Sequence, residues 1–237
     1  MAIVSGGSSG IGRAFVEALL DQDYVVYACG RDPSRLDRLA DACPDVRAIT
    51  CDVTDRSAVR RFAASVARER DGIDLLISNA GGSREVDLRV MDRCPDLTSE
   101  MRVNFEGAVN LIAEFLPLLK RAAPSALVVV GSGYGLVPSP RVPLYSASKA
   151  ALHSLATTLR HDLKPLGITV TEVCPPVVDT PSVRHRQVAK MPPERVVAQT
   201  LKAASKGVAT IYPGKARFLP LLNRLAPSLA QRIVART

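Results

Sequence analysis

Residues 2–12 read AIVSGGSSGIG, and this stretch decides the fold that the sequence predicts. Its first four residues form a short apolar run, which is typical of a strand covered on both faces. The glycine-rich turn that follows leads into a helical pattern. Because glycines carry no side chain, such a turn lets the N–H groups at a helix N-terminus approach a pyrophosphate closely. The spacing of Gly6, Gly10 and Gly12 is not the G-x-G-x-x-G fingerprint, so an ordinary tight turn remains an alternative.

Short apolar runs and longer amphipathic segments alternate along the rest of the chain. This alternation predicts βαβ units and a parallel sheet. Right-handed crossovers then give a doubly wound, Rossmann-like α/β sheet of about seven strands with helices on both faces. No repeat or linker divides it, so we expect one domain over residues 1–237. The strands are predicted at 2–5, 24–29, 48–51, 75–78, 126–131, 169–174 and 209–212, and the helices at 11–21, 33–42, 55–70, 97–121, 145–164 and within 216–234.

Composition excludes several classes of function. The net charge is +8, yet Lys and Arg form no run, aromatic residues are 4% and Trp is absent, so we expect no nucleic-acid partner. The five cysteines show no CxxC pair, which favours reduced thiols, and no metal-ligand spacing appears, so we expect no metal site. No signal-peptide pattern or membrane-spanning apolar run is visible, and a cytoplasmic location is the expectation.

The end of the second predicted strand bears on cofactor choice. A site for NAD needs a carboxylate there to bind the ribose 2′-hydroxyl. In this chain Gly30 holds that place and Arg31 follows it, and a guanidinium can grip a 2′-phosphate with two hydrogen bonds. We therefore favour NADP(H) over NAD(H). NAD(H) remains the alternative, because Asp32 could bind the ribose 2′-hydroxyl if the register differed by two residues.

Two further strand ends carry polar residues. Asp52 follows the third strand and could accept from an adenine amino group, or it could cap the next helix. The segment 79–81, Asn-Ala-Gly, closes the fourth strand, where an amide and a glycine suit a loop that braces a cofactor crevice.

The most informative segment is 145–149, Tyr-Ser-Ala-Ser-Lys. On a helix, Tyr145 and Lys149 are i and i+4 and share one face. A free phenol has a pKa of about 10. A neighbouring ammonium lowers it, so the tuned tyrosine can serve as a general acid for a carbonyl oxygen. Taken alone, this spacing is also common in surface helix pairs.

Other motifs give that pair its context. Ser132 lies thirteen residues before Tyr145 at a strand end, and Asn104 lies in a long predicted helix. Together with the glycine turn and the segment 79–81, they occur in the order and spacing of the short-chain dehydrogenase/reductase family, which this chain resembles over nearly its whole length.

The resemblance implies a role for each matched residue. Tyr145 would be the catalytic acid/base, and Lys149 would lower its pKa and hold the nicotinamide ribose. Ser132 would bind the substrate carbonyl, and Asn104 would hold a water of the proton relay. The cofactor would be bound by Gly6, Ser8, Ser9, Gly10, Ile11, Gly12, Arg31, Asp52, Val53, Asn79, Ala80, Gly81, Tyr145, Lys149, Pro175, Val178 and Thr180.

Within the family, the chain resembles DltE-like bacterial oxidoreductases in the segments 29–31, 142–145, 149–154, 159–161 and 175–177. It resembles 3-ketosphinganine reductases more weakly, in the double proline and in the segment 179–181. It departs from the common pattern at 174–180, Cys-Pro-Pro-Val-Val-Asp-Thr, where Pro176 replaces a usual glycine. Proline fixes φ and removes an N–H, which changes the backbone contacts of a loop that normally meets the nicotinamide. The resemblance also implies a homodimer or homotetramer formed through the helices at 97–121 and 145–164.

Substrate specificity is expected at residues 82–98, at 133–144 and in a lid at about 180–192. The lid carries Arg184, His185, Arg186 and Lys190, which would either recognise an acidic substrate or be solvated. The amphipathic, basic segment at 215–237 is expected to cover the cleft or a neighbouring subunit first, and to contact a membrane surface second.

Several charged residues receive no catalytic role from the sequence. We expect His153 and His161 to be structural, and Glu106, Glu114 and Glu172 to be solvated or paired. The leading function is reduction of a ketone or aldehyde, or the reverse oxidation, by NADP(H). A cofactor-sensing regulatory protein without turnover and a lyase or epimerase on the same site are the alternatives.

Overall fold

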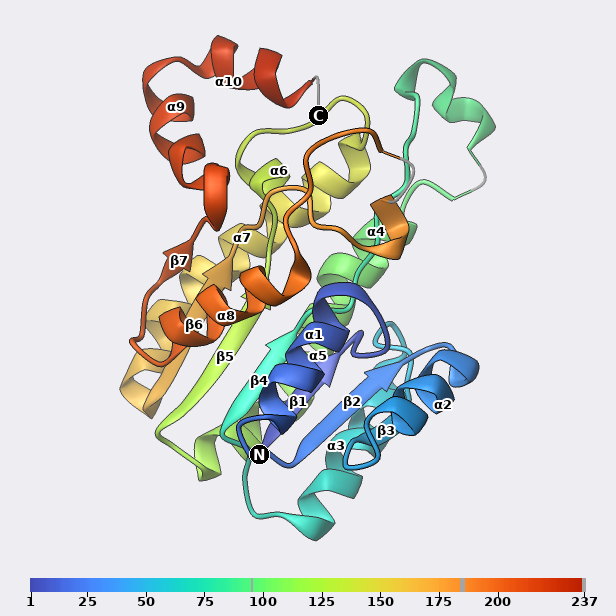
Figure 1. Cartoon of the computed structure of the whole chain (residues 1–237), viewed down its shortest axis with the longest axis vertical. Coiled ribbons are helices and arrows are strands. Elements are labelled where there is room, and N and C mark those ends of the chain that lie inside the picture. Colours follow the sequence, from blue (N-terminus) through green and yellow to red (C-terminus); the bar gives the residue numbers. More distant parts are fainter. Residues whose placement is uncertain (95, 184–185, 236–237) are drawn as a thin grey trace.

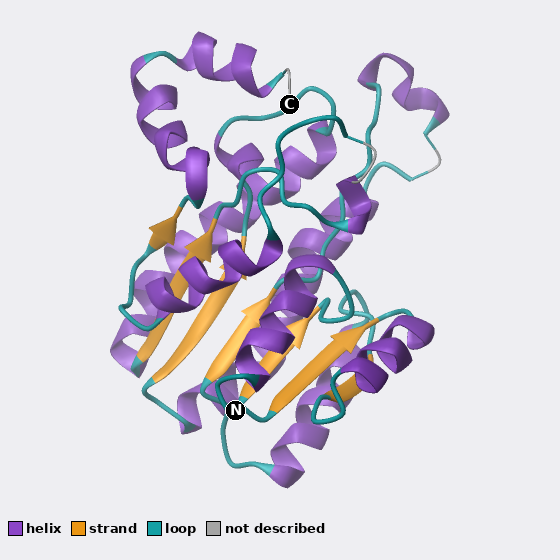
Figure 2. Cartoon of the chain, in the orientation of Figure 1, coloured by secondary structure: helices purple, strands orange, loops and turns teal. Residues whose placement is uncertain are grey.

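A computed structural model describes residues 1–94, 96–183 and 186–235. Its centre is one parallel sheet with the strand order β3-β2-β1-β4-β5-β6-β7, drawn in orange in Figure 2. This order places β1 and β4 in the middle, where both faces are covered, and this explains their uninterrupted apolar sequences. The strands are β1 Ala2–Ser5, β2 Val26–Gly30, β3 Arg47–Thr50, β4 Leu75–Ser78, β5 Ser125–Val130, β6 Ile168–Val173 and β7 Thr210–Ile211.

Helices cover both faces of the sheet (Figure 1). One face packs against α1 (Gly10–Leu20), α2 (Pro33–Ala42) and α8 (Pro193–Ala204). The other packs against α3 (Arg56–Glu69), α5 (Gly107–Arg121) and α7 (Pro143–Leu163). The predicted seven-stranded, doubly wound sheet is therefore confirmed. The short helices are α4 Ser99–Met101, α6 Gly133–Leu136, α9 Leu219–Leu225 and α10 Pro227–Val234. Further helical turns lie at η1 Leu88–Arg93, η2 Arg102–Glu106, η3 Lys164–Leu166, η4 Pro181–Val183 and η5 Gly214–Phe218.

Two aromatic rings form the centre of the core between α3 and α5. Phe62 and Phe115 meet edge to face, with ring centroids 5.0 Å apart, and both side chains are buried. This geometry is the favoured one for aromatic pairs. The ring of Phe115 is fully enclosed, so its removal would leave a cavity in the helix layer.

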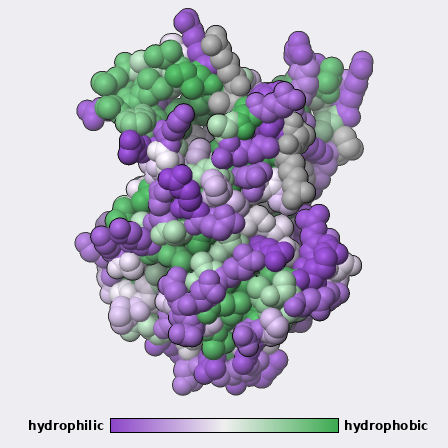
Figure 3. All heavy atoms as spheres, viewed as in Figure 1, coloured by the Kyte–Doolittle hydropathy of each residue, from purple (hydrophilic) through white to green (hydrophobic). Residues whose placement is uncertain are grey.

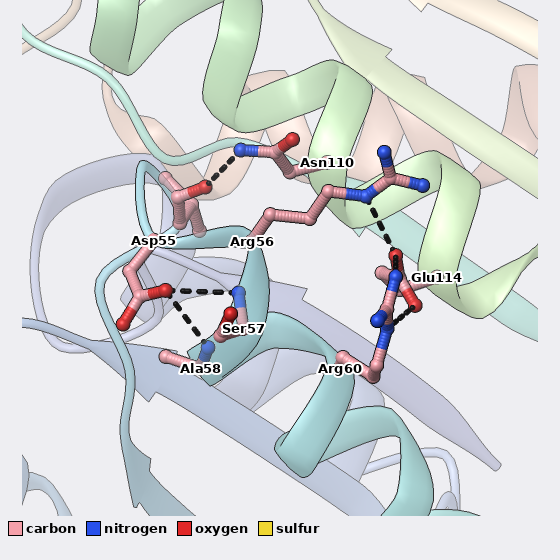
Figure 4. A network of polar contacts seen from close by, with 8 residues as sticks. Asp55, Arg56, Ser57, Ala58, Arg60, Asn110 and Glu114 are labelled. Carbon is pink, nitrogen blue, oxygen red and sulfur yellow. Dashed lines mark hydrogen bonds and ion pairs between the residues drawn. The ribbon is translucent and has the colours of Figure 1, made fainter.

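A polar network ties the same two helices together at their outer side (Figure 4). Glu114 of α5 accepts hydrogen bonds from Arg56 at 2.8 Å and from Arg60 at 3.2 Å, both on α3. Asp55 caps α3 by accepting from two N–H groups of its first turn, and Asn110 donates to the Val53 carbonyl at 3.0 Å. Glu114 is thus paired, as expected from the sequence.

Besides the short helix α6, which was not predicted, the helices differ from the sequence prediction in three places. Helix α8 was not predicted, although Pro193 and Glu194 occupy its first turn and Val196, Val197, Thr200 and Ala203 give it a buried face. The long helix predicted at 97–121 begins at Ser99 and contains a wider π-type turn at Arg102–Glu106. The tail holds two helices, because Ala226 and Pro227 interrupt it. Among the described residues, no helix is both long and apolar enough to cross a lipid bilayer.

Replacing Phe115 by alanine should destabilise the fold. We expect the free energy of unfolding to fall by about 3–5 kcal/mol, because a buried phenyl ring is lost and the site cannot collapse fully. Urea unfolding followed by circular dichroism measures this. The matched control is Phe218→Ala, whose ring is 57% exposed and whose loss should change the free energy by about 0.5 kcal/mol or less. Equal effects of the two substitutions would contradict the core position of Phe115.

Candidate active site

A cavity of about 1190 Å³ lies at the carboxyl ends of the parallel strands. It extends from Gly30 at the end of β2, past Ser132 after β5, to Leu219 at the start of α9. Carboxyl ends of parallel strands meet at one edge of a sheet, so loops far apart in sequence are brought to a common crevice there.

The glycine turn between β1 and α1 forms one wall of this cavity. Gly6 has φ +64°, and a Cβ atom on it would lie 2.9 Å from the side-chain nitrogen of Asn79. A Cβ on Gly12 would lie 2.1 Å from the Gly6 carbonyl oxygen, so no side chain fits there. Ser9, the N-cap of α1, makes no side-chain bond to the first N–H groups of the helix. The turn therefore offers unfilled backbone donors to an anion.

Most of the predicted cofactor residues line this cavity; Gly12 and Asp52 do not. Gly12 is buried beneath the turn. Asp52 accepts hydrogen bonds from the N–H and the hydroxyl of Thr54, at 2.9 and 2.8 Å. The residues that do line it are Gly6, Ser8, Ser9, Gly10, Ile11, Arg31, Val53, Asn79, Ala80, Gly81, Tyr145, Lys149, Pro175, Val178 and Thr180.

At the end of β2, the position where a carboxylate would bind a ribose is held by Gly30, the last residue of the strand. Asp32 caps α2 by accepting from the Arg35 N–H at 3.2 Å, and its other oxygen pairs with the Arg35 guanidinium at 3.1 Å. Arg31 and Arg35 both line the cavity. This wall thus carries two guanidinium groups, and its one nearby carboxylate is already engaged.

Ser132, Tyr145 and Lys149 also line the cavity. Ser132 is the N-cap of α6 and accepts from the Tyr134 N–H at 3.1 Å. Lys149 donates to the Val130 carbonyl at 2.7 Å, and its Nζ lies 5.7 Å from the centroid of the Tyr145 ring. The i, i+4 spacing on α7 thus places phenol and ammonium on the same side of the helix, as the sequence predicts.

Burial sets the protonation of this pair. It raises the pKa of Tyr145 to about 12, although a hydrogen bond with Ser132 works in the opposite direction. Burial lowers the pKa of Lys149 to about 8, against the nearby Cys174 and Glu172, which raise it. The sequence predicts that Lys149 lowers the pKa of the Tyr145 phenol. In the structure the pKa is raised instead, because desolvation of the tyrosine outweighs the charges around it.

Asn104 lies in the π-type turn and is buried. Its amide oxygen accepts from the Gly82 N–H at 2.8 Å, and its amide nitrogen donates to the Gly82 carbonyl at 3.0 Å and to Ser148 at 2.9 Å. Asn104 therefore fixes the loop after β4 against α7, next to the Tyr145–Lys149 helix face. Its predicted role as a water ligand stays a prediction.

A second polar cluster lies behind Lys149, between α7 and β6. The Glu172 carboxylate is fully buried; one of its oxygens lies 2.7 Å from His153 Nδ1 and the other has no partner in the described part of the chain. His153, Glu172 and Cys174 each offer one side-chain atom that could bind a metal ion, and these three atoms all lie within 4.8 Å of one another. Burial, together with the Glu172 charge, raises the pKa of the Cys174 thiol. Glu172 is thus paired, as expected, and its partner His153 meets it in the interior. His161, the other histidine of α7, lies at the surface beside Asp162.

The lid and the C-terminal segment close the cavity. Two backbone hydrogen bonds of 2.9 Å hold the loop 175–180 in place. The N–H of Asp179 donates to the carbonyl of Met191, and the N–H of Met191 donates to the carbonyl of Val177. Arg186 is buried in the cavity wall and lies 3.4 Å from Glu85. Arg184 and His185 lie outside the described residues.

The C-terminal segment covers the cleft, which was the first of its expected positions. Leu219, Leu222 and Val234 line the cavity, and Val234 also packs against Val137 with Ala230. Sequence reasoning missed these residues because their contacts depend on how the tail folds back. It also missed Arg35, although the Asp32 helix cap three residues earlier placed Arg35 in the first turn of α2.

The short chain dehydrogenase family model matches residues 1–190. An uncharacterized oxidoreductase of Bacillus subtilis, DltE, is 36% identical over 180 residues, which are 75% of this chain and 71% of that protein. A Burkholderia cenocepacia short chain dehydrogenase solved in complex with NADP has a TM-score of 0.86 at 29% identity and covers 98% of this chain and 96% of its own. The Pseudomonas aeruginosa RhlG/NADP complex gives 0.81 at 26%, covering 91% and 95%. With the ordered motifs and the cavity that they form, these findings place the chain in the short-chain dehydrogenase/reductase family of oxidoreductases.

Proposed function

We propose that the protein is an NADP(H)-dependent oxidoreductase that interconverts a ketone or aldehyde and the corresponding alcohol. The observation that carries this proposal is the shared cavity, which is lined both by Ser132, Tyr145 and Lys149 and by the glycine turn. A hydroxyl donor, a phenol and an anion cradle in one cavity fit a reaction in which negative charge develops on a carbonyl oxygen.

The residues around the cavity fit a dinucleotide. The N–H groups of the first turn of α1 would hold the pyrophosphate, and the absence of side chains at Gly6 and Gly10 leaves room for it. Arg31 and Arg35 would pair with a 2′-phosphate, and Asn79 to Gly81 would line the ribose and nicotinamide side. Pro175, Val178 and Thr180 would contact the carboxamide end. When bound, the nicotinamide ring supplies the hydride.

The chain's own residues would then handle the proton. In the reducing direction, Ser132 donates a hydrogen bond to the carbonyl oxygen and Tyr145 gives it a proton. Lys149 remains protonated near neutral pH because its pKa is about 8, and its positive charge stabilises the phenolate that is left. Glu172 supports that charge from behind, and Asn104 holds the loop at Gly82 against α7.

We also propose that the family's usual homodimer or homotetramer forms through the outer faces of α5 and α7, where Val109 is an exposed apolar residue. Sedimentation at several protein concentrations would test this assembly. A protein that stays monomeric at micromolar concentration would contradict it.

Replacing Tyr145 by phenylalanine should lower kcat about a thousandfold, because the proton donor is lost while the ring is kept. NADPH oxidation with a panel of ketones and aldehydes measures the rate, and fluorescence titration checks that NADPH still binds. The control is Tyr134→Phe, whose ring lies 6.4 Å from that of Tyr145 in the same cavity and whose change should cost less than about tenfold.

The same assay separates the alternatives. Binding of NADPH without turnover on any carbonyl compound would favour a cofactor sensor. Product formation without net NADPH loss would favour a lyase or epimerase. Either result would overturn the proposed reduction.

Replacing Arg31 and Arg35 together by alanine should weaken NADPH selectively. Each charge-assisted bond to a phosphate contributes about 1.5–3 kcal/mol, so we expect the Kd for NADPH to rise at least about tenfold while that for NADH stays unchanged. Arg38→Ala is the matched control, since Arg38 lies on the same helix but does not line the cavity. An equal loss of affinity for both cofactors would contradict recognition of a 2′-phosphate.

Replacing Glu172 by glutamine should shift the pH dependence. The carboxylate raises the pKa of Lys149, so its removal lowers that pKa further below the ordinary value. The reaction needs protonated Lys149; the rate falls as pH rises through its pKa, and this fall should begin at a pH lower by roughly one unit. The pH profile of kcat measures it, with the exposed Glu106→Gln as control. An unchanged profile would contradict the role of Glu172.

A further inference from the structure

The C-terminal helices leave an apolar surface uncovered. Phe218, Leu221, Leu225, Leu229 and Ile233, here called the outer face, are all exposed, with Leu225 the most exposed at 72%. Figure 3 shows this hydrophobic group over α9 and α10 at the top left of the molecule. Isolated exposed leucines are ordinary, but a group of this kind on two short consecutive helices marks an interaction surface.

The inner side of the same helices is firmly packed. Ala230 and Val234 of α10 are buried against Val137, and Leu219 and Leu222 of α9 pack against this cluster. The outer face is therefore held in place by the rest of the fold. The outer side chains are exposed because the helices are amphipathic and only their inner residues pack against the rest of the chain.

The C-terminal segment that carries this surface has basic but no acidic side chains. The last acidic residue is Glu194, and no Asp or Glu follows it in the sequence. Lys215, Arg217, Arg224 and Arg232 belong to the same C-terminal segment as the outer face and are exposed, and none of them forms an ion pair within the described residues. The guanidinium of Arg217 lies 4.7 Å from the centroid of the Phe218 ring, directly beside the apolar group.

The substrate cavity reaches this same surface. Phe218 and Ile233 belong to the outer face and also line the cavity, together with Leu219 and Leu222. A compound that reaches the cavity past these residues therefore crosses an apolar, positively charged rim.

We propose that the outer face binds the surface of an anionic lipid bilayer, and that the carbonyl substrate is a lipophilic compound that enters the cavity from it. Exposed leucine and phenylalanine side chains enter the boundary between headgroups and acyl chains, and arginine and lysine pair with anionic headgroups. A second copy of this chain would bring the same positive charges against the face, which opposes a dimer there. The substrate part of this inference rests on the proposed function.

Flotation of the full-length protein with vesicles tests the binding. We expect the protein to bind phosphatidylglycerol/phosphatidylcholine vesicles at low salt, to bind pure phosphatidylcholine at least tenfold less, and to be released by salt. Leu221→Gln with Leu225→Gln should abolish binding, and Arg224→Gln with Arg232→Gln should weaken it at least tenfold. Leu88→Gln with Met91→Gln is the matched control, because these exposed residues lie far from the tail in sequence, on the turn at Leu88–Arg93.

Three outcomes would overturn the membrane proposal. They are no binding to anionic vesicles, an equal loss in the control variant, or a dimer that the Leu221 and Leu225 substitutions dissociate. Circular dichroism and NADPH titration of each variant verify that it is folded.

A kinetic comparison tests the substrate part. The Leu221 and Leu225 substitutions should slow reduction of a long-chain ketone carried in vesicles at least tenfold and leave reduction of a short, water-soluble ketone unchanged. Equal rates on the vesicle-borne ketone would overturn it. Vesicle binding without turnover of any ketone would instead count against the proposed function alone, because binding does not depend on catalysis. For the same reason, Tyr145→Phe should bind vesicles as well as the unmodified protein does.

Discussion

The backbone of Gly12 passes so close to the Gly6 carbonyl oxygen that nothing larger than hydrogen fits between them. This contact brings the start of α1 down onto the end of β1, in the middle of the sheet. Asn79 completes the junction by donating to the Ser5 carbonyl at 2.9 Å, so the ends of β1 and β4 are joined beside the turn. The cavity exists because these two neighbouring strands end together and because the helix above them begins without a side-chain cap. A side chain at either glycine would push the helix away and remove this part of the cavity lining.

The central sheet could be predicted from the sequence because its strands are buried on both faces and therefore appear as short, continuous apolar runs. The elements at the edge of the site were harder. Helix α8 has two adjacent valines, which weaken a helical pattern, and its buried positions face α1, so its role depends on tertiary packing. In the tail, the amphipathic pattern was visible, but the break at Ala226 and the division of the leucines into inner and outer sides follow from how the two helices fold back.

The site shows the same division between local and long-range information. The shared helix face of Tyr145 and Lys149 is local, so a spacing of four residues was enough to predict it, whereas their place in a site had to be inferred from the other motifs. The buried Glu172 and its partner His153 come from β6 and α7, and the sequence gives no sign that they meet behind Lys149. Burial is also a property of the fold alone. For that reason the sequence suggests a phenol made acidic by its lysine, whereas the enclosed site makes the phenol less acidic and the ammonium more so.

One contact couples the two halves of the cavity. The methyl group of Thr180, at the base of the lid, would lie 2.9 Å from a Cβ on Gly10, so the lid begins directly beside the turn that we propose as the pyrophosphate site. A β-bridge between Val178 and Met191 joins the two ends of the lid, so the far end is fixed beside the same turn. On the proposed function, a dinucleotide seated on the turn would support the lid from below before any carbonyl compound is present. The kinetic consequence of that proposal is a compulsory order, in which the cofactor binds first and leaves last.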